Sequence, residues 1–172
     1  MRSTFGAMCH RVRPATATDA PAIAALNGFV QALHHERRPD RFTAPDAAAL
    51  TPVVEEWLRS EHRRLWLAEG ESGVPVGYVI GVRFERAASG LVAGASVVEL
   101  DQVVVDPSAR GRGCARALCE AVLHWAEEVG ADRVELSTWA FNESAQSLFA
   151  HLGFVTDFLR LSRPTGSGSD RR

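Results

Sequence analysis

LDQVVVDPSARGRGCA, residues 100–115, is the stretch that decides the fold of this chain. Its first half is an apolar run interrupted by Asp101 and Gln102, which predicts a buried strand. Its second half, Arg110–Gly113, is a loop with two glycines that leads into an apolar-striped helix. A helix start presents backbone N–H groups without internal partners and the positive end of the helix dipole. The stretch therefore predicts a binding site for an anionic phosphate group, to which the two arginines add charge.

Two other phosphate-binding patterns do not fit the chain. G-x-x-x-x-G-K-[ST] needs a lysine, and all nineteen basic residues are arginine. The dinucleotide pattern G-x-G-x-x-G is not completed after Gly111 and Gly113. Taken alone, the loop leaves an ordinary arginine-bearing turn as the alternative.

Composition indicates one soluble globular domain. The 172 residues are 46% hydrophobic and 23% charged, and the formal charge of −2 gives no general attraction to nucleic acid or to anionic membranes. Three cysteines, Cys9, Cys114 and Cys119, show no metal-ligand spacing, and their odd number favours a reducing cytoplasm over a disulfide framework. We expect one domain over 10–162, an N-terminal extension over 1–9 and a disordered tail over 163–172.

Apolar periodicity and turn residues predict the remaining elements. Gly70–Gly73 is a hairpin turn, and Gly130 ends the helix that follows the phosphate loop. The predicted strands cover 10–13, 64–68, 74–84, 96–105, 133–137 and 154–161, and the predicted helices cover 19–35, 46–58, 115–129 and 142–151. The resulting order, β-α-α-β-β-β-α-β-α-β, is that of a mixed α/β protein.

A second motif follows the predicted strand 133–137. It is VELSTWAFNESA over 134–145, closed by FAHLGF over 149–154. Together with R-x-x-G-x-A at 110–115, and in this order of elements, it resembles the GNAT superfamily of N-acetyltransferases from about residue 10 to 162. The resemblance implies an α/β (α+β) fold, with a mixed six- to seven-stranded sheet flanked by four helices.

The resemblance also implies acetyl-CoA as co-substrate. Its thioester arm would lie along the strand like an extra strand, and a backbone N–H near Val103 would face the thioester oxygen, a contact worth about 3 kcal/mol in other enzymes. Asn142 would touch the pantetheine arm, or cap the last helix. The implied cofactor-binding residues are Val103, Val104, Val105, Arg110, Gly111, Arg112, Gly113, Cys114, Ala115, Arg116, Asn142, Ala145 and Phe149.

Transfer of an acetyl group to an amine needs a proton acceptor, because alkyl ammonium groups have pKa values of about 10. Asp101 is the first candidate, since a carboxylate inside an apolar run is expected to be buried for a reason. Glu99 is the second, and its two-residue spacing predicts that both share one face of the strand. The alternatives for Glu99 are a solvated strand face or an arginine partner.

One residue departs from the family pattern. Many members have a tyrosine at the position of Phe149, where its hydroxyl protonates the departing CoA thiolate, and the only tyrosine here is Tyr78. Three explanations remain open: the thiolate leaves as an anion near a helix N-terminus, Ser144, Ser147 or a water donates the proton, or the protein binds acyl-CoA without efficient catalysis.

We expect acceptor recognition from the first two helices and the link between them, residues 34–42, and from the loop 87–94, because loops on a rigid scaffold usually carry recognition. The candidate substrate-binding residues are His34, Phe42 and Trp139. The alternatives are that His34 only forms a polar helix end and that Trp139 only packs in the core. Arginines in the link fit an acidic acceptor, whereas Glu99 and Asp101 fit a cationic one.

The sequence thus predicts a cytoplasmic acetyl-CoA-dependent N-acetyltransferase acting on a primary amine of a small molecule, with no metal, nucleic-acid or membrane partner. The alternatives are a protein or peptide N-acetyltransferase and a non-catalytic acyl-CoA-binding regulator. A homodimer is expected from the family habit alone.

Overall fold

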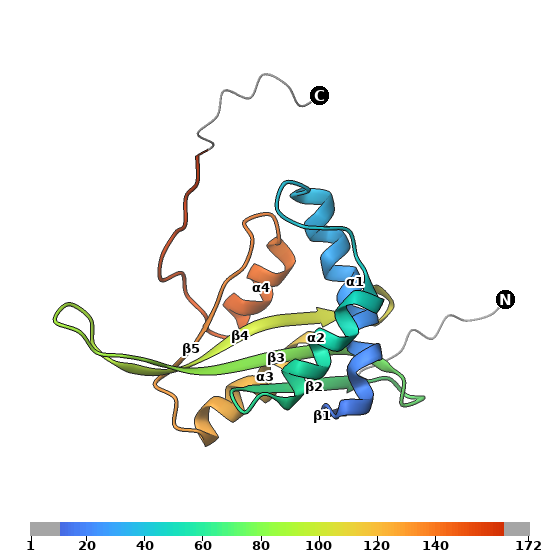
Figure 1. Cartoon of the computed structure of the whole chain (residues 1–172), viewed down its shortest axis with the longest axis horizontal. Coiled ribbons are helices and arrows are strands. Elements are labelled where there is room, and N and C mark those ends of the chain that lie inside the picture. Colours follow the sequence, from blue (N-terminus) through green and yellow to red (C-terminus); the bar gives the residue numbers. More distant parts are fainter. Residues whose placement is uncertain (1–10, 164–172) are drawn as a thin grey trace. The chain divides into compact units, whose positions relative to one another are not determined.

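A single mixed sheet organises the chain. The structure, a computed structural model, describes residues 11–163, and within them five strands follow one another in the order β1-β2-β3-β4-β5. All neighbours are antiparallel except β4 and β5, which are parallel (Figure 1). The strands are β1 (Arg11–Pro14), β2 (Arg63–Glu69), β3 (Pro75–Arg86), β4 (Ala95–Val105) and β5 (Arg133–Leu136).

The helices lie where the sequence predicted them. They are α1 (Ala20–Arg37), α2 (Ala47–Arg59), α3 (Cys114–Glu128) and α4 (Glu143–His151), with short 3-10 turns at Ala17–Asp19 and Pro107–Ala109. Asp46 caps α2 by accepting a hydrogen bond from the backbone N–H of Ala49 at 2.9 Å. Gly130 follows α3 with φ +65°, a conformation that glycine adopts without strain.

The chain divides into two compact units, Met1–Trp139 and Ala140–Arg172. The sheet, α1, α2 and α3 belong to the first unit, and α4 belongs to the second. The predicted extension 1–9, the first residue of the predicted strand 10–13 and all of the predicted tail except Arg163 lie outside the described residues.

The predicted strand over 154–161 and the count of six to seven strands are wrong for the described residues. No strand follows β5 there, and after α4 the side chains of Val155, Phe158, Leu159 and Leu161 are 73–90% exposed. Apolar residues give a segment the propensity for a strand, but a strand also needs a neighbour whose backbone groups pair with its own.

Helices cover both faces of the sheet. On one face, α1 and α2 pack against side chains of β2, β3 and β4. On the other face, β3 passes close to α3: a Cβ at Gly81 would lie 2.8 Å from the Trp125 ring, and one at Gly77 would lie 3.2 Å from Leu118. Covering on both faces explains why β4 carries a continuous apolar run at its end. The core of the α1/α2 face comprises Ala20, Ile23, Ala24, Leu26, Val54, Leu65, Leu67, Tyr78, Ile80 and Val104.

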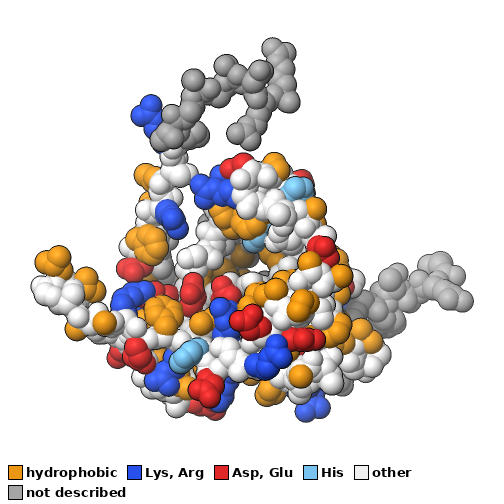
Figure 2. Space-filling model, viewed as in Figure 1, with side chains coloured by type: hydrophobic (Ala, Val, Ile, Leu, Met, Phe, Trp, Pro, Cys, Tyr) orange, Lys and Arg blue, Asp and Glu red, His pale blue; other side chains and the backbone are white. Residues whose placement is uncertain are grey.

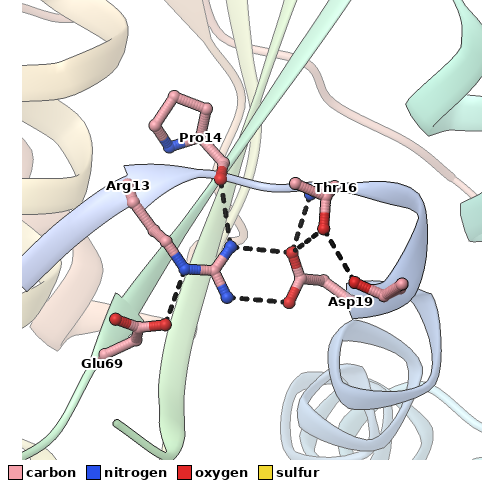
Figure 3. Close-up of polar contacts among 6 residues, drawn as sticks. Arg13, Pro14, Thr16, Asp19 and Glu69 are labelled. Atoms are coloured by element: carbon pink, nitrogen blue, oxygen red, sulfur yellow. Dashed lines mark hydrogen bonds and ion pairs between the residues drawn. The ribbon is translucent and has the colours of Figure 1, made fainter.

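An ion-pair cluster ties the first strand to the start of α1 (Figure 3). The guanidinium of Arg13 donates to both carboxylate oxygens of Asp19 at 2.8 Å and to Glu69 at 2.6 Å. Asp19 also accepts hydrogen bonds from the backbone N–H and the hydroxyl of Thr16, at 2.7 and 2.9 Å. These hydrogen bonds, that from Arg13 above all, hold the pKa of the largely buried Asp19 well below its ordinary value.

The cluster makes the stability of the fold sensitive to acid. At neutral pH, Asp19→Asn should lower the free energy of unfolding by about 1–3 kcal/mol, because a buried charged hydrogen-bond network loses its acceptor. The folded-state pKa of Asp19 is lowered, so its contribution is complete above the unfolded pKa of about 3.9 and disappears as the pH falls further. Urea unfolding at several pH values measures both effects, with Asp157→Asn, an exposed carboxylate, as control. A difference between wild type and Asp19→Asn that stays constant down to pH 2 would contradict this role.

Two glycines test the packing of the sheet. Gly77→Ala should destabilise the protein by about 1–3 kcal/mol through overpacking, because its Cβ would lie 2.7 Å from the Val104 carbonyl oxygen. Gly28→Ala, inside α1 with no atom within 4 Å of its Cβ, should instead stabilise it by about 0.5–1 kcal/mol. Urea midpoints of the two variants should therefore move in opposite directions. Equal shifts of the two urea midpoints would contradict the close approach of β3 to β4 at Gly77.

Candidate active site

The strand β4 loses one of its two neighbours halfway along its length. It pairs with β3 as far as Val105 but with β5 only over Val97–Leu100. Beyond Leu100, no strand in the described part of the chain pairs with this edge of β4. Figure 1 shows β4 continuing past the end of β5.

The main chain of Val103 and Val105 faces this open edge. The backbone N–H of Asp106 donates to the Val76 carbonyl on β3 at 2.8 Å. Because antiparallel residues alternate between hydrogen-bonded and non-bonded pairs, Val104 turns its main chain toward Tyr78 on β3, and Val103 and Val105 turn theirs away. The Nε of Arg110 accordingly reaches the Val105 carbonyl oxygen from outside the sheet, at 3.1 Å.

A bulge at Asp101 sets which side chains reach the α1/α2 face. Ile80 is opposite Gln102 and Gly81 is opposite Leu100, so Asp101 is the extra residue of β4. Ile80 belongs to the core under α1 and α2 and Val82 packs against it, so their partners Gln102 and Glu99 share that face. Because Asp101 is an extra residue, its two-residue spacing from Glu99 does not by itself place both side chains on one face of the strand. The negative charge of Asp101 nevertheless raises the pKa of Glu99.

The two candidate carboxylates differ in their surroundings. The expectation that Asp101 is buried is wrong: its side chain is 35% exposed and forms an ion pair with Arg63 at 3.5 Å, because the bulge turns it out of the apolar alternation. Glu99 is half-buried, and burial, followed by the charges of Asp101 and Glu135, raises its pKa. Glu135 is bound by Arg133 at 2.6 Å and by Arg86 at 3.0 Å. Glu99 is thus the carboxylate of this group whose environment makes it the better proton acceptor.

A polar network lies beneath the bulge. The Tyr78 hydroxyl donates to Gln102 Oε1 at 2.8 Å, and Asn27 on α1 donates to the same oxygen at 3.1 Å and to the Tyr78 hydroxyl at 2.8 Å. Tyr78 is fully buried, and burial raises its pKa. The only tyrosine of the chain therefore holds its proton in the core. Gln102 was not predicted to have a role, although a polar residue beside Asp101 in an apolar run is a signal for one.

The loop at the start of α3 presents its backbone to open space. Gly111 and Gly113 have φ values of +72° and +79°, and a Cβ on either would meet no described atom within 4 Å. The exposed loop leads into Cys114, which is buried, and Ala115, which is half-buried. Arg116 pairs with Glu120 at 2.8 Å, whereas Arg112 is exposed. The loop thus has the uncovered N–H groups and positive charge that a phosphate group requires.

The three candidate acceptor residues come together. The Phe42 ring lies 4.7 Å from His34 and 5.5 Å from Trp139, and His34 lies 6.3 Å from Trp139. Partial burial in this cluster lowers the pKa of His34. The guanidinium groups of Arg38 and Arg41 stack on the Trp139 ring at 5.5 and 5.7 Å. The charge of the link is evident from the sequence, but this stacking on Trp139 is not.

The second unit holds three of the predicted cofactor-binding residues. Asn142 occupies the N-cap position of α4, but its side chain accepts no hydrogen bond from the helix backbone and instead accepts one from the Ser144 hydroxyl at 3.3 Å. Ala145 lies in the first turn of α4, and Phe149 is buried against Phe154, with ring centroids 5.9 Å apart. The roles of Asn142, Ala145 and Phe149 remain predictions.

Within 11–163, no three or more His, Cys, Asp or Glu side chains are grouped closely enough to hold a metal ion. None of the helices in the same range has the length and apolarity needed to cross a membrane. Figure 2 shows acidic and basic side chains interspersed over the face that it presents.

Comparison with known proteins identifies related chains. The profile of the acetyltransferase (GNAT) family matches residues 30–154. The uncharacterized N-acetyltransferase YjgM of Escherichia coli is 29% identical over 143 residues, which are 83% of this chain and 80% of that protein. Mycothiol acetyltransferase of Beutenbergia cavernae is 41% identical over 64 residues, so the match covers 37% of this chain and only 22% of that relative. The solved structure of aminoglycoside N-acetyltransferase AAC(6')-Iy in complex with CoA has a TM-score of 0.68 and 23% identity, over 91% of this chain and 95% of that one.

Proposed function

The chain belongs to the acetyltransferase (GNAT) family, and on that premise we propose that it is an acetyl-CoA-dependent N-acetyltransferase acting on a primary amine of a small molecule. One observation carries the proposal. The main-chain edge of β4 that is open at Val103 and Val105 runs directly into the glycine loop at the start of α3. An extended arm and a diphosphate are the two parts of one ligand that such a continuous surface fits.

Each part of the surface has a role in holding CoA. Val103 and Val105 would pair with the extended arm as a neighbouring strand does, and the loop N–H groups around Gly111 and Gly113 would bind the diphosphate. Arg112 adds positive charge beside it. Acetyl-CoA supplies the activated acetyl thioester, and the N–H of Val103 is the donor at the edge that would stabilise its oxygen.

We assign proton acceptance to Glu99 in preference to Asp101, although Asp101 is the first candidate from the sequence. Burial raises the pKa of Glu99, whereas Asp101 is exposed and paired with Arg63. Asp101 would attract the ammonium group and maintain the raised pKa of Glu99. Phe149 has no proton to give and Tyr78 donates its own to Gln102, so we assign stabilisation of the departing thiolate to the positive end of α3.

A small acceptor is favoured over a peptide. His34 at the end of α1 and Phe42 in the link after it both contact Trp139, which also belongs to the first unit. The aminoglycoside acetyltransferase among the similar structures is named for a small-molecule amine, which supports this class. Cys119 is a buried free cysteine, which supports a reducing compartment, for which we propose the cytoplasm. The homodimer rests on the family resemblance alone.

Release of free thiol from acetyl-CoA tests the function. Purified protein is incubated with acetyl-CoA and a panel of small primary amines, with short peptides as a parallel set. Turnover on at least one small amine is expected, and turnover on peptides alone would favour the peptide-acetylating alternative. CoA binding by calorimetry without turnover on any acceptor would favour a non-catalytic regulator.

A pair of glycine variants tests the CoA site. Gly113→Ala forces a side chain into the left-handed region, at a cost of about 1–2 kcal/mol, and should weaken CoA binding by about tenfold. Gly73→Ala carries the same strain at φ +73° in the β2–β3 turn and should leave CoA affinity unchanged. Calorimetric titration with CoA distinguishes the two. Equal affinities in both variants would place the diphosphate elsewhere.

The acid limb of the pH profile tests Glu99. Catalysis needs the deprotonated carboxylate, so kcat/KM should fall as the pH drops through its raised pKa, and Glu99→Gln should lower kcat/KM by about a hundredfold. Asp101→Asn removes a negative charge that raises this pKa, so the acid limb should move to lower pH. Glu71→Gln, in the exposed β2–β3 turn, is the control. An acid limb that Asp101→Asn leaves in place, together with full activity of Glu99→Gln, would assign the proton to another group.

A further inference from the structure

We propose that the acceptor amine carries a carboxylate at its far end, which Arg41 binds beside Trp139. This inference rests on the proposed function and names its substrate class. The first unit holds two groups of opposite charge: the carboxylates of Glu99, on the α1/α2 face, and Asp101, at the bulge, and the arginines stacked on Trp139. An acceptor with an ammonium group at one end and a carboxylate at the other complements both.

The helix α1 connects the two groups. Asn27 donates to Gln102 beside the bulge, and His34 contacts Phe42 at the aromatic cluster. Asn27, His34 and Arg38 are spaced by seven and four residues, so they follow one side of the helix and its end. Seven residues of helix correspond to about 10 Å. The separation between the bulge and the aromatic cluster is therefore of the order spanned by an amine and a carboxylate joined by several methylene groups.

The end of β5 gives a second, independent connection. Leu136, the last residue of β5, is paired with Leu100, which lies between Glu99 and Asp101. Trp139 follows three residues later, a span of at most about 10 Å of extended chain. Both chain segments thus place the arginine-stacked ring within reach of a ligand whose amine lies at the carboxylates.

The two arginines are not equivalent. Asp40 binds the guanidinium of Arg38 through two hydrogen bonds of 2.9 and 2.8 Å, but it approaches Arg41 only to 3.9 Å. The Arg41 side chain is 44% exposed and retains its planar fork of donors, which matches a carboxylate. Two arginines against one aspartate leave a net positive charge at this ring. Arg38 lowers the pKa of Asp40 to about 2, so Asp40 is an ionised competitor for Arg41 at neutral pH.

Binding of matched amines to the protein in saturating CoA tests the inference. The probes are ε-aminocaproate, hexylamine and hexamethylenediamine, which share a chain of similar length and differ at the end opposite the amine. We expect ε-aminocaproate to bind about tenfold more tightly than hexylamine, and Arg41→Gln to remove that preference. Asp40→Asn, which frees Arg41 from its competitor, should tighten ε-aminocaproate binding and leave hexylamine unchanged. Arg37→Gln, the exposed last residue of α1, is the matched control.

The readouts separate this inference from the proposed function. Calorimetry reports the carboxylate preference whether or not acetyl transfer occurs, and thiol release reports transfer whichever amine is preferred. Equal affinity for ε-aminocaproate and hexylamine, or a preference that survives Arg41→Gln, would overturn the inference and limit the arginines to stacking on Trp139. Preference without thiol release from any amine would instead count against the proposed function. A gain of affinity in Asp40→Asn is a result that a purely structural role of the link does not produce.

Discussion

Backbone hydrogen bonding of β4 is the constraint on which the site depends. Each residue of a strand offers an N–H and a C=O that need partners. Over Val97–Leu100 both edges of β4 are paired with strands, but after Leu100 only β3 remains beside it. Because α1 and α2 cover one face and α3 the other, a ligand cannot approach these groups from above or below the sheet. Within the first unit, the edge without a strand partner is the remaining approach, and it leads to the start of α3.

The bulge at Asp101 determines how charge is distributed around this edge. Without the bulge, a regularly alternating strand would place Glu99 and Asp101 on one face and point Gln102 to the α3 face. With it, Gln102 joins Tyr78 and Asn27 in the core network, and Asp101 turns outward to Arg63. Glu135 is bound by two arginines, whereas Glu99 remains beside these charges in a half-buried position. The carboxylates of one small region thereby acquire different proton affinities.

Local sequence signals located the elements well where a single element satisfies its own requirements. Apolar stripes predicted α1, α2 and α3, and glycines located the β2–β3 turn and the end of α3. Two predictions failed where a distant partner decides the outcome. The apolar segment 154–161 forms no strand in the structure, and Asp101 is exposed although its neighbours in sequence are apolar. His34, Phe42 and Trp139 were selected from three separate segments, and the contacts among them could not be derived from spacing.

The amino-acid sequence by itself determined the glycine loop, the helix that follows it, the apolar strand before it and the resemblance that links them. These depend on backbone conformations and periodicities that neighbouring residues impose on one another. The tertiary structure decided that β5 leaves β4 after Leu100, that Asp101 is a bulge residue and that arginines stack on Trp139. Strand pairing and register, side-chain burial and contacts between distant segments are settled by packing in three dimensions, and residue order along the chain does not encode them locally.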